Sequence, residues 1–80
     1  MKSDMPVDST LDTFGLLCPM PIIKTAARMR ELQHGNVLRV LSDDPGVLED
    51  MPAWCRTSGN ELIRIDEIAG EYHVYIRKNG

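Results

Sequence analysis

Four stretches of the chain have the apolar pattern of β-strands. Residues 9–13 show this pattern least clearly, whereas residues 37–41 are apolar enough for a strand in the middle of a sheet. Residues 61–66 and 72–77 alternate apolar and polar side chains, which is typical of strands with one buried face. Because a tight turn at Ala69-Gly70-Glu71 separates the last two stretches, they are expected to pair as an antiparallel hairpin.

Two other stretches have the spacing of amphipathic helices. The first runs from Pro19 to about Gln33, and its apolar stripe consists of Ile22, Ala26, Met29 and Leu32, with Ile23 and Ala27 alongside. The second covers residues 47–58. Pro52 either kinks this second helix or follows a fresh start that Asp50 caps. The second interpretation is preferred, because a helix tolerates proline in its first turn.

The order of these elements is βαβαββ, which predicts one fold class. It is an α/β two-layer sandwich, with two helices on one face of a four-stranded mixed sheet. The sequence is interpreted as a flexible leader at residues 1–8, followed by a single domain at residues 9–80.

Composition and charge narrow the classes of function. The chain has 80 residues and a net charge of −3, which argues against strong nucleic-acid binding, because such domains usually have a basic excess. It has no apolar run of membrane-spanning length and no apolar signal segment, so we expect a cytoplasmic protein without direct membrane binding. In a reducing compartment its two cysteines are expected to be free thiols. No set of cysteines and histidines has the spacing of a metal site.

Cys18 is the candidate reactive residue. It stands in the run Gly15-Leu16-Leu17-Cys18-Pro19-Met20-Pro21, directly before the first predicted helix. Unpaired N–H groups and the helix dipole favour a thiolate at a helix N-terminus, and the thiolate is the nucleophilic form. Pro19 and Pro21 are expected to support the helix entrance, where a missing N–H costs little. The alternative is that Cys18 is a small buried apolar residue.

The rest of the sequence limits the chemistry open to this thiol. A hydrolytic cysteine enzyme needs a base, but His34 is predicted at the far end of the helix, on the order of 20 Å away. His73 is less favoured, since strand alternation turns it away from the core. A dithiol enzyme needs a nearby resolving cysteine, and Cys55 fits either that role or packing in the core. Transfer of sulfur as a persulfide requires only one exposed thiol, and it fits Cys18 well.

A set of short motifs is spread along most of the chain. They are Leu11-Asp12, Gly15-Leu16, Cys18-Pro19-Met20-Pro21, Asp43-Asp44-Pro45, Asp50-Met51-Pro52-Ala53-Trp54-Cys55 and Ile76-Arg77-Lys78. With this spacing the chain resembles the TusA (SirA-like) family of sulfur-carrier proteins from Leu11 to Lys78. The resemblance implies a βαβαββ fold and a sulfurtransferase in which Cys18 holds sulfane sulfur as a persulfide. It implies no metal and no organic cofactor.

The same resemblance implies the partners. A cysteine desulfurase or a rhodanese would donate the sulfur, and a downstream acceptor protein would use it in tRNA thiolation, molybdenum-cofactor assembly or sulfur oxidation. Since a carrier passes between such partners, we expect a monomer that forms transient complexes. Leu17 departs from the polar or charged residue that many family members have beside the thiol.

Four residues near the thiol in sequence or by motif are candidates for partner docking: Met20, Lys24, Arg28 and Asp44. Lys24 and Arg28 lie four apart on one helix face, although a solvated face has the same pattern. Met20 is either an adaptable docking residue or packs inward. Asp44 and Asp50 could orient the basic surface of a partner or tune Cys18; alternatively, Asp44 begins a turn and Asp50 caps a helical turn. Two other functions stay open: a non-catalytic regulatory interaction module, and a thiol redox sensor that uses Cys18 and Cys55.

Overall fold

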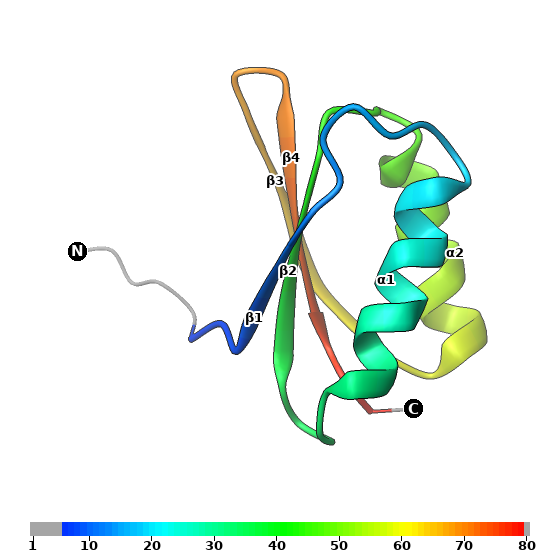
Figure 1. Ribbon diagram of the computed structural model, residues 1–80, viewed down its shortest axis with the longest axis vertical. Coiled ribbons are helices and arrows are strands. Elements are labelled where there is room, and N and C mark those ends of the chain that lie inside the picture. The colour runs from blue at the N-terminus through cyan, green and yellow to red at the C-terminus, as the bar shows by residue number, and fades with distance from the viewer. Residues whose placement is uncertain (1–5, 80) are drawn as a thin grey trace.

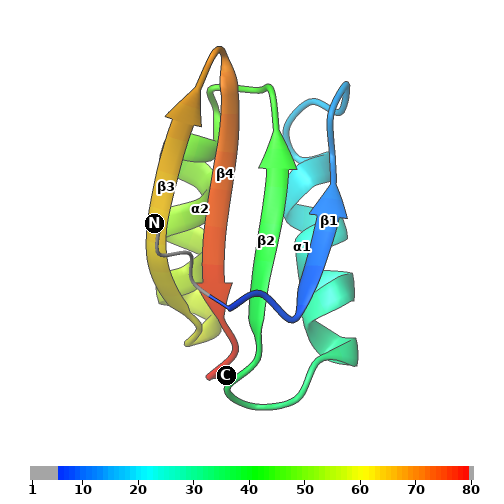
Figure 2. The same cartoon turned by 90° about the vertical axis from the view of Figure 1, so that its left-hand side faces the viewer.

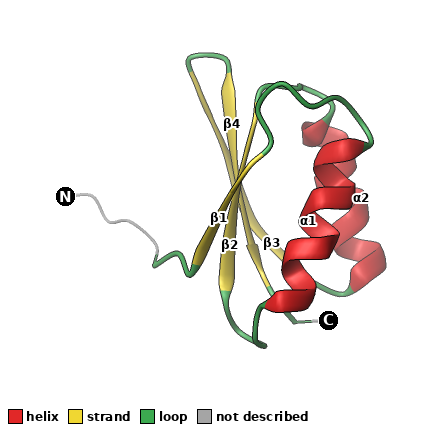
Figure 3. Cartoon of the chain, viewed as in Figure 1, coloured by secondary structure: helices red, strands yellow, loops and turns green. Residues whose placement is uncertain are grey.

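The computed structural model describes residues 6–79 and contains six elements in the predicted order (Figure 3). They are β1 (Ser9–Asp12), α1 (Met20–Glu31), β2 (Val37–Ser42), α2 (Val47–Ser58), β3 (Glu61–Ile68) and β4 (Glu71–Arg77). The four strands form one mixed sheet in the order β1-β2-β4-β3. β1 runs parallel to β2, while β4 is antiparallel to both β2 and β3.

Both helices cover the same face of the sheet, and within residues 6–79 no helix lies on the other face (Figures 1 and 2). This arrangement confirms the predicted two-layer sandwich. The β3–β4 hairpin is confirmed as well, with the register Ile65↔Val74 and Ile68↔Glu71. Its turn places Ala69 and Gly70 at positive φ, 52° and 82°, as a two-residue hairpin turn requires.

The core lies between the sheet and the helices. Its buried members are Leu11, Met29, Leu38, Val40, Val47, Met51, Cys55, Tyr72, Val74 and Ile76. β2 and β4 contribute alternate residues, as period-two patterning predicts, whereas β3 contributes only the partly buried Leu62 and Ile65. α2 contributes Val47, Met51 and Cys55, which are spaced four apart and therefore share one helix face.

α1 turns its predicted apolar stripe toward the core, because Met29 is buried and Ile22 and Leu32 pack against the core, but the residues alongside the stripe behave differently. Its buried residues are Pro21, Thr25 and Met29, whereas Ile23 is 52% exposed and Ala27 is also exposed. The expectation that Ile23 and Ala27 lie along the buried stripe is therefore wrong.

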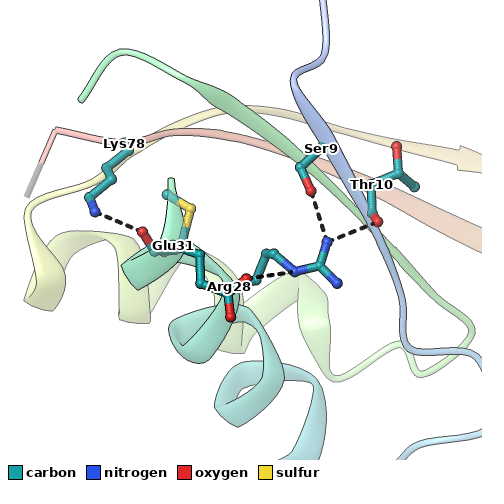
Figure 4. A network of polar contacts seen from close by, with 6 residues as sticks. Ser9, Thr10, Arg28, Glu31 and Lys78 are labelled. Atoms are coloured by element: carbon teal, nitrogen blue, oxygen red, sulfur yellow. Dashed lines mark hydrogen bonds and ion pairs between the residues drawn. The ribbon is translucent and has the colours of Figure 1, made fainter. Parts of the chain in front are cut away.

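Polar contacts also tie α1 to the sheet and to the C-terminal segment (Figure 4). The Arg28 guanidinium donates hydrogen bonds to Ser9 Oγ at 2.8 Å and to the Thr10 carbonyl at 3.3 Å, which ties the helix to β1. At the C-terminal end of the helix, Lys78 Nζ donates to the carbonyls of Met29 and Leu32 at 2.7 and 2.8 Å. These contacts hold the C-terminal half of α1 in place, and hydrophobic spacing alone does not reveal them.

α2 is one continuous helix with Pro52 inside it, so the preferred interpretation of a fresh start capped by Asp50 is wrong. The helix begins at Val47, after a tight turn in which Val47 N–H donates to the Asp44 carbonyl at 3.1 Å. Proline in a helix interior removes one hydrogen bond. Burial of Val47, Met51 and Cys55 against the sheet stabilises both sides of Pro52, and this offsets that loss.

The predicted leader is only partly described, because residues 1–5 lie outside the described range. Within that range, Asp8 N–H donates to the Val37 carbonyl at 2.9 Å, and Asp8 Oδ2 accepts from Val37 N–H at 2.8 Å. Neither helix of residues 6–79 is long and apolar enough to cross a membrane.

Candidate functional site

The site forms where the loops after β1 and β2 meet. Because these strands are parallel neighbours, their C-terminal ends lie at the same edge of the sheet (Figure 1). The β1–α1 loop is anchored there by Thr13, whose N–H and hydroxyl both donate to the Leu41 carbonyl, at 2.8 and 2.6 Å. Gly15 then allows a turn at φ 81°, which brings the chain back over the second loop.

Two carboxylates of the β2–α2 loop hold the β1–α1 loop in place. Asp43 Oδ1 accepts from Gly15 N–H at 3.1 Å, and Asp44 Oδ2 accepts from Cys18 N–H at 3.0 Å. Asp44 is held in turn, because its other carboxylate oxygen accepts from Gly46 N–H and its own N–H donates to Ser42 Oγ, both at 3.0 Å. The backbone of Cys18 is therefore fixed by a residue 26 positions away in the chain.

The two prolines lie at the helix entrance. Pro19 is the N-cap residue, Pro21 is the second residue of α1, and the Cys18–Pro19 peptide bond is cis. Met20 N–H donates to the Leu17 carbonyl at 2.9 Å, and the N–H groups of Ile22 and Ile23 donate to the Pro19 carbonyl at 3.1 Å. The first turn of α1 thus has no N–H group left for the sulfur, because each is either missing or already bonded.

The Cys18 thiol instead donates to a carboxylate from the other helix. Its Sγ lies 2.9 Å from Asp50 Oδ2, and the residue is exposed. This hydrogen bond raises the pKa of the thiol above its ordinary value of 9.0, and desolvation and the negative charges of Asp50 and Asp44 act in the same direction. The helix terminus alone would lower the pKa, so the structure reverses the expected direction.

Neither histidine is placed to act on this thiol. His34 lies beyond the far end of α1. His73 lies on β4 between the core residues Tyr72 and Val74, so it faces the uncovered side of the sheet, where its Nε2 is 3.6 Å from Glu71 Oε1. Within residues 6–79 there is also no group of three or more metal-ligating side chains. The site therefore has an exposed sulfur beside a carboxylate, and neither histidine lies next to that sulfur.

Cys55 has a different environment from Cys18. It is 3% exposed, packs in the core, and burial raises the pKa of its thiol to about 11. Such a thiol is almost wholly protonated near neutral pH and is shielded from reagents. In the described part of the chain, Cys18 is the one accessible thiol.

The structure separates the four residues predicted for docking. Met20 is 38% exposed beside Cys18, and Lys24 is exposed one turn further along α1. Arg28 points toward β1 rather than toward the thiol, and Asp44 bonds the backbone of Cys18.

Sequence reasoning gave less weight to Asp50 as a contact of the thiol, and it overlooked Asp43 as an anchor of Gly15. For Asp43 a signal was present in the sequence, because this carboxylate follows directly after β2, the strand that pairs in parallel with β1.

Comparison with known proteins settles the family. A family model described as sulfurtransferase TusA matches residues 9–78. The chain belongs to the TusA family. This confirms the resemblance found in the motifs from Leu11 to Lys78, and it places this protein among the sulfur carriers at the general level.

Individual TusA relatives agree with the family match. A sulfur carrier protein TusA from Pseudomonas fluorescens is 42% identical over 76 residues, which cover 95% of this chain and 92% of that protein. A putative sulfur carrier protein from Aquifex aeolicus is 42% identical over 71 residues, but the match covers only 36% of that longer protein. The crystal structure of a SirA-like protein from Desulfitobacterium hafniense has a TM-score of 0.77 at 25% identity, covering 90% of this chain and 99% of that one.

Proposed function

We propose that this protein carries sulfane sulfur as a persulfide on Cys18. In the loading step, the Cys18 sulfur attacks the outer sulfur of a donor persulfide, R–S–SH. The donor's S–S bond breaks, a new S–S bond forms on Cys18, and the donor leaves as R–SH after taking a proton. In the delivery step, an acceptor thiol attacks the outer sulfur on Cys18 and restores the Cys18 thiol. Neither step needs an oxidant or a reductant.

The exposure of Cys18 at the meeting point of two loops is the observation that carries this proposal. A persulfide extends the side chain by one sulfur atom, and an exposed residue can accommodate it without repacking. Because neither histidine of the protein lies beside Cys18, the donor and acceptor would supply the proton transfers. A reducing cytoplasm suits both thiols, because neither Cys18 nor Cys55 is in a disulfide.

Sulfur loading tests this function directly. The purified protein is incubated with a cysteine desulfurase and cysteine, and intact mass and peptide mapping then locate any added sulfur. We expect one sulfur atom on Cys18 that moves to a second thiol protein, and we expect Cys55→Ala to behave like the wild type. Sulfur that still loads on a folded Cys18→Ala variant, or none on the wild type, would overturn the proposal.

A further inference from the structure

Asp50 is the carboxylate that contacts the Cys18 sulfur, with its Oδ2 2.9 Å from Sγ. Within residues 6–79 this carboxylate has no other hydrogen bond and no ion pair. Asp43 and Asp44 differ from it, because both accept hydrogen bonds from backbone N–H groups of the two loops. The fold thus uses Asp43 and Asp44 to shape the loops, and it leaves Asp50 available to the proton that the sulfur presents.

Loading with sulfur changes which atom of Cys18 can donate. In the empty protein the thiol proton lies between Sγ and Asp50. In the persulfide, Sγ is bonded to Cβ and to the outer sulfur, so the side-chain proton is on the outer sulfur. An S–S bond is about 2 Å long, and rotation about the Cβ–Sγ bond of an exposed residue moves the outer sulfur freely. The outer S–H can therefore replace the thiol as the donor to Asp50.

The charged groups that face the sulfur are acidic. Asp50 reaches it from α2, and Asp44 lies on the adjoining β2–α2 loop, where it bonds the Cys18 N–H. Both already raise the pKa of the empty thiol. In the described part of the chain, neither the exposed Lys24 of α1 nor the exposed Glu49 of α2 bonds the sulfur. A deprotonated persulfide would add a third negative charge beside two carboxylates, so these surroundings favour the neutral S–SH form.

The neutral form is the one that gives sulfur away. An acceptor thiolate attacks the outer sulfur, the S–S bond breaks, and its electron pair stays on Cys18. A negative charge on the outer sulfur would repel this attack and make that sulfur a nucleophile instead. With the proton in place, the product is the acceptor's S–SH. Cys18 leaves as a thiolate, and it then takes up a proton equivalent to the one that the acceptor thiol released.

We propose that Asp50 is a catalytic residue with opposite effects on the two steps: it slows loading by holding the thiol proton, and it speeds delivery by holding the outer sulfur as S–SH. The inference rests on the proposed function, since it requires a persulfide on Cys18. The same carboxylate weakens Cys18 as a leaving group, but this opposing effect is smaller. Exchange rates change by roughly half a power of ten per unit of thiol pKa, whereas the protonated fraction changes by a full power.

Separate rates for the two steps test this inference. Glutathione persulfide loads the purified protein, glutathione then serves as the acceptor, and intact mass follows the sulfur on Cys18. At pH 8 we expect Asp50→Asn to load faster than the wild type and to deliver about threefold more slowly. The lost charge lowers the protonated fraction of the persulfide by about tenfold, and the better leaving group offsets part of that loss. Glu49→Gln removes a neighbouring charge that does not bond the sulfur, so it should match the wild type at both steps.

A second measurement reports the proton on the outer sulfur. Iodoacetamide alkylates the anionic form of the loaded residue, so the rate against pH follows its deprotonation. The profile of Asp50→Asn should lie at lower pH than the profiles of the wild type and Glu49→Gln. The inference is overturned if Asp50→Asn, folded by circular dichroism, delivers at the wild-type rate, is slower at both steps or has an unmoved profile. A wild type that accepts no sulfur from glutathione persulfide or from a cysteine desulfurase would instead overturn the proposed function.

Discussion

The alkylation rate of the buried Cys55 thiol gives a quantitative test of which cysteine is reactive. We expect Cys55 to react with iodoacetamide at pH 8 at least about a hundredfold more slowly in the folded protein than in the urea-unfolded chain. The folded protein holds Cys55 at 3% exposure with a pKa of about 11, whereas an unfolded thiol has its ordinary value of 9.0. Alkylation requires the thiolate, so its rate follows the ionised fraction.

The size of the effect follows from these two pKa values. At pH 8, a thiol with a pKa of about 11 is ionised in roughly one molecule per thousand, and a thiol at 9.0 in roughly one per eleven. Their ratio is close to a hundred. Shielding of the sulfur by the core slows the reaction further, so a hundredfold is the lower bound.

The assay uses the Cys18→Ala variant, in which Cys55 is the remaining cysteine. Alkylation is followed by intact mass in buffer and in urea at the same pH, and far-UV circular dichroism checks that the variant is folded. Rates within about threefold of each other would refute the reasoning. They would also revive the redox sensor, since Cys55 would then be accessible to pair with Cys18.

Three further expectations follow from single contacts. Asp50→Asn removes the carboxylate that accepts the thiol hydrogen bond, so the pKa of Cys18 should fall and its rate of alkylation should rise at lower pH. An unchanged dependence of the rate on pH, or the same shift in the control variant Glu49→Gln, would contradict this. Lys78→Met removes two charged hydrogen bonds at the end of α1 and should lower the free energy of unfolding by about 1.5–3 kcal/mol in urea titrations, whereas the exposed Lys24→Met should change it by less than about 0.5 kcal/mol. Because folding raises the pKa of Cys55, the stability that this thiol contributes is fully present below pH 9 and is lost between pH 9 and about 11, a total of about 2.7 kcal/mol. The Cys55→Ala variant should not lose this stability, and an equally steep fall of its free energy of unfolding would be evidence against the prediction.

The sequence predicted the fold because each strand and helix has a local pattern that tertiary packing reinforces. Tyr72, Val74 and Ile76 alternate and do face the helices, and Ala69-Gly70 forms the expected hairpin turn. The two errors both concern helices. Pro52 was interpreted from its neighbours alone as part of a new helix start, but burial of the residues around it keeps α2 continuous. Ile23 was placed alongside the apolar stripe of α1 by its spacing, but it is 52% exposed.

The site was predictable in its position but not in its electrostatics. Cys18 before two prolines indicates a thiol at a helix entrance, and the structure places it there. The contact with Asp50 spans 32 positions, and it depends on how the β1–α1 loop sits against α2. No local pattern encodes that distance. The same holds for Arg28, whose guanidinium is directed to β1 by tertiary packing.

The environment of Cys18 favours a carrier whose thiol reacts slowly when no partner is bound. A thiol hydrogen-bonded to Asp50 has a smaller thiolate fraction than a free one, so stray alkylating agents and oxidants attack it more slowly. In the proposed loading step, the same proton must leave before Cys18 attacks a donor persulfide. A partner that brings a cation to Asp50 would remove this restraint only within the complex. Under the proposed function, the acidic surroundings of the sulfur would therefore confine its reactivity to the docked state. A helix N-terminus with free N–H groups would instead leave the thiol reactive at all times.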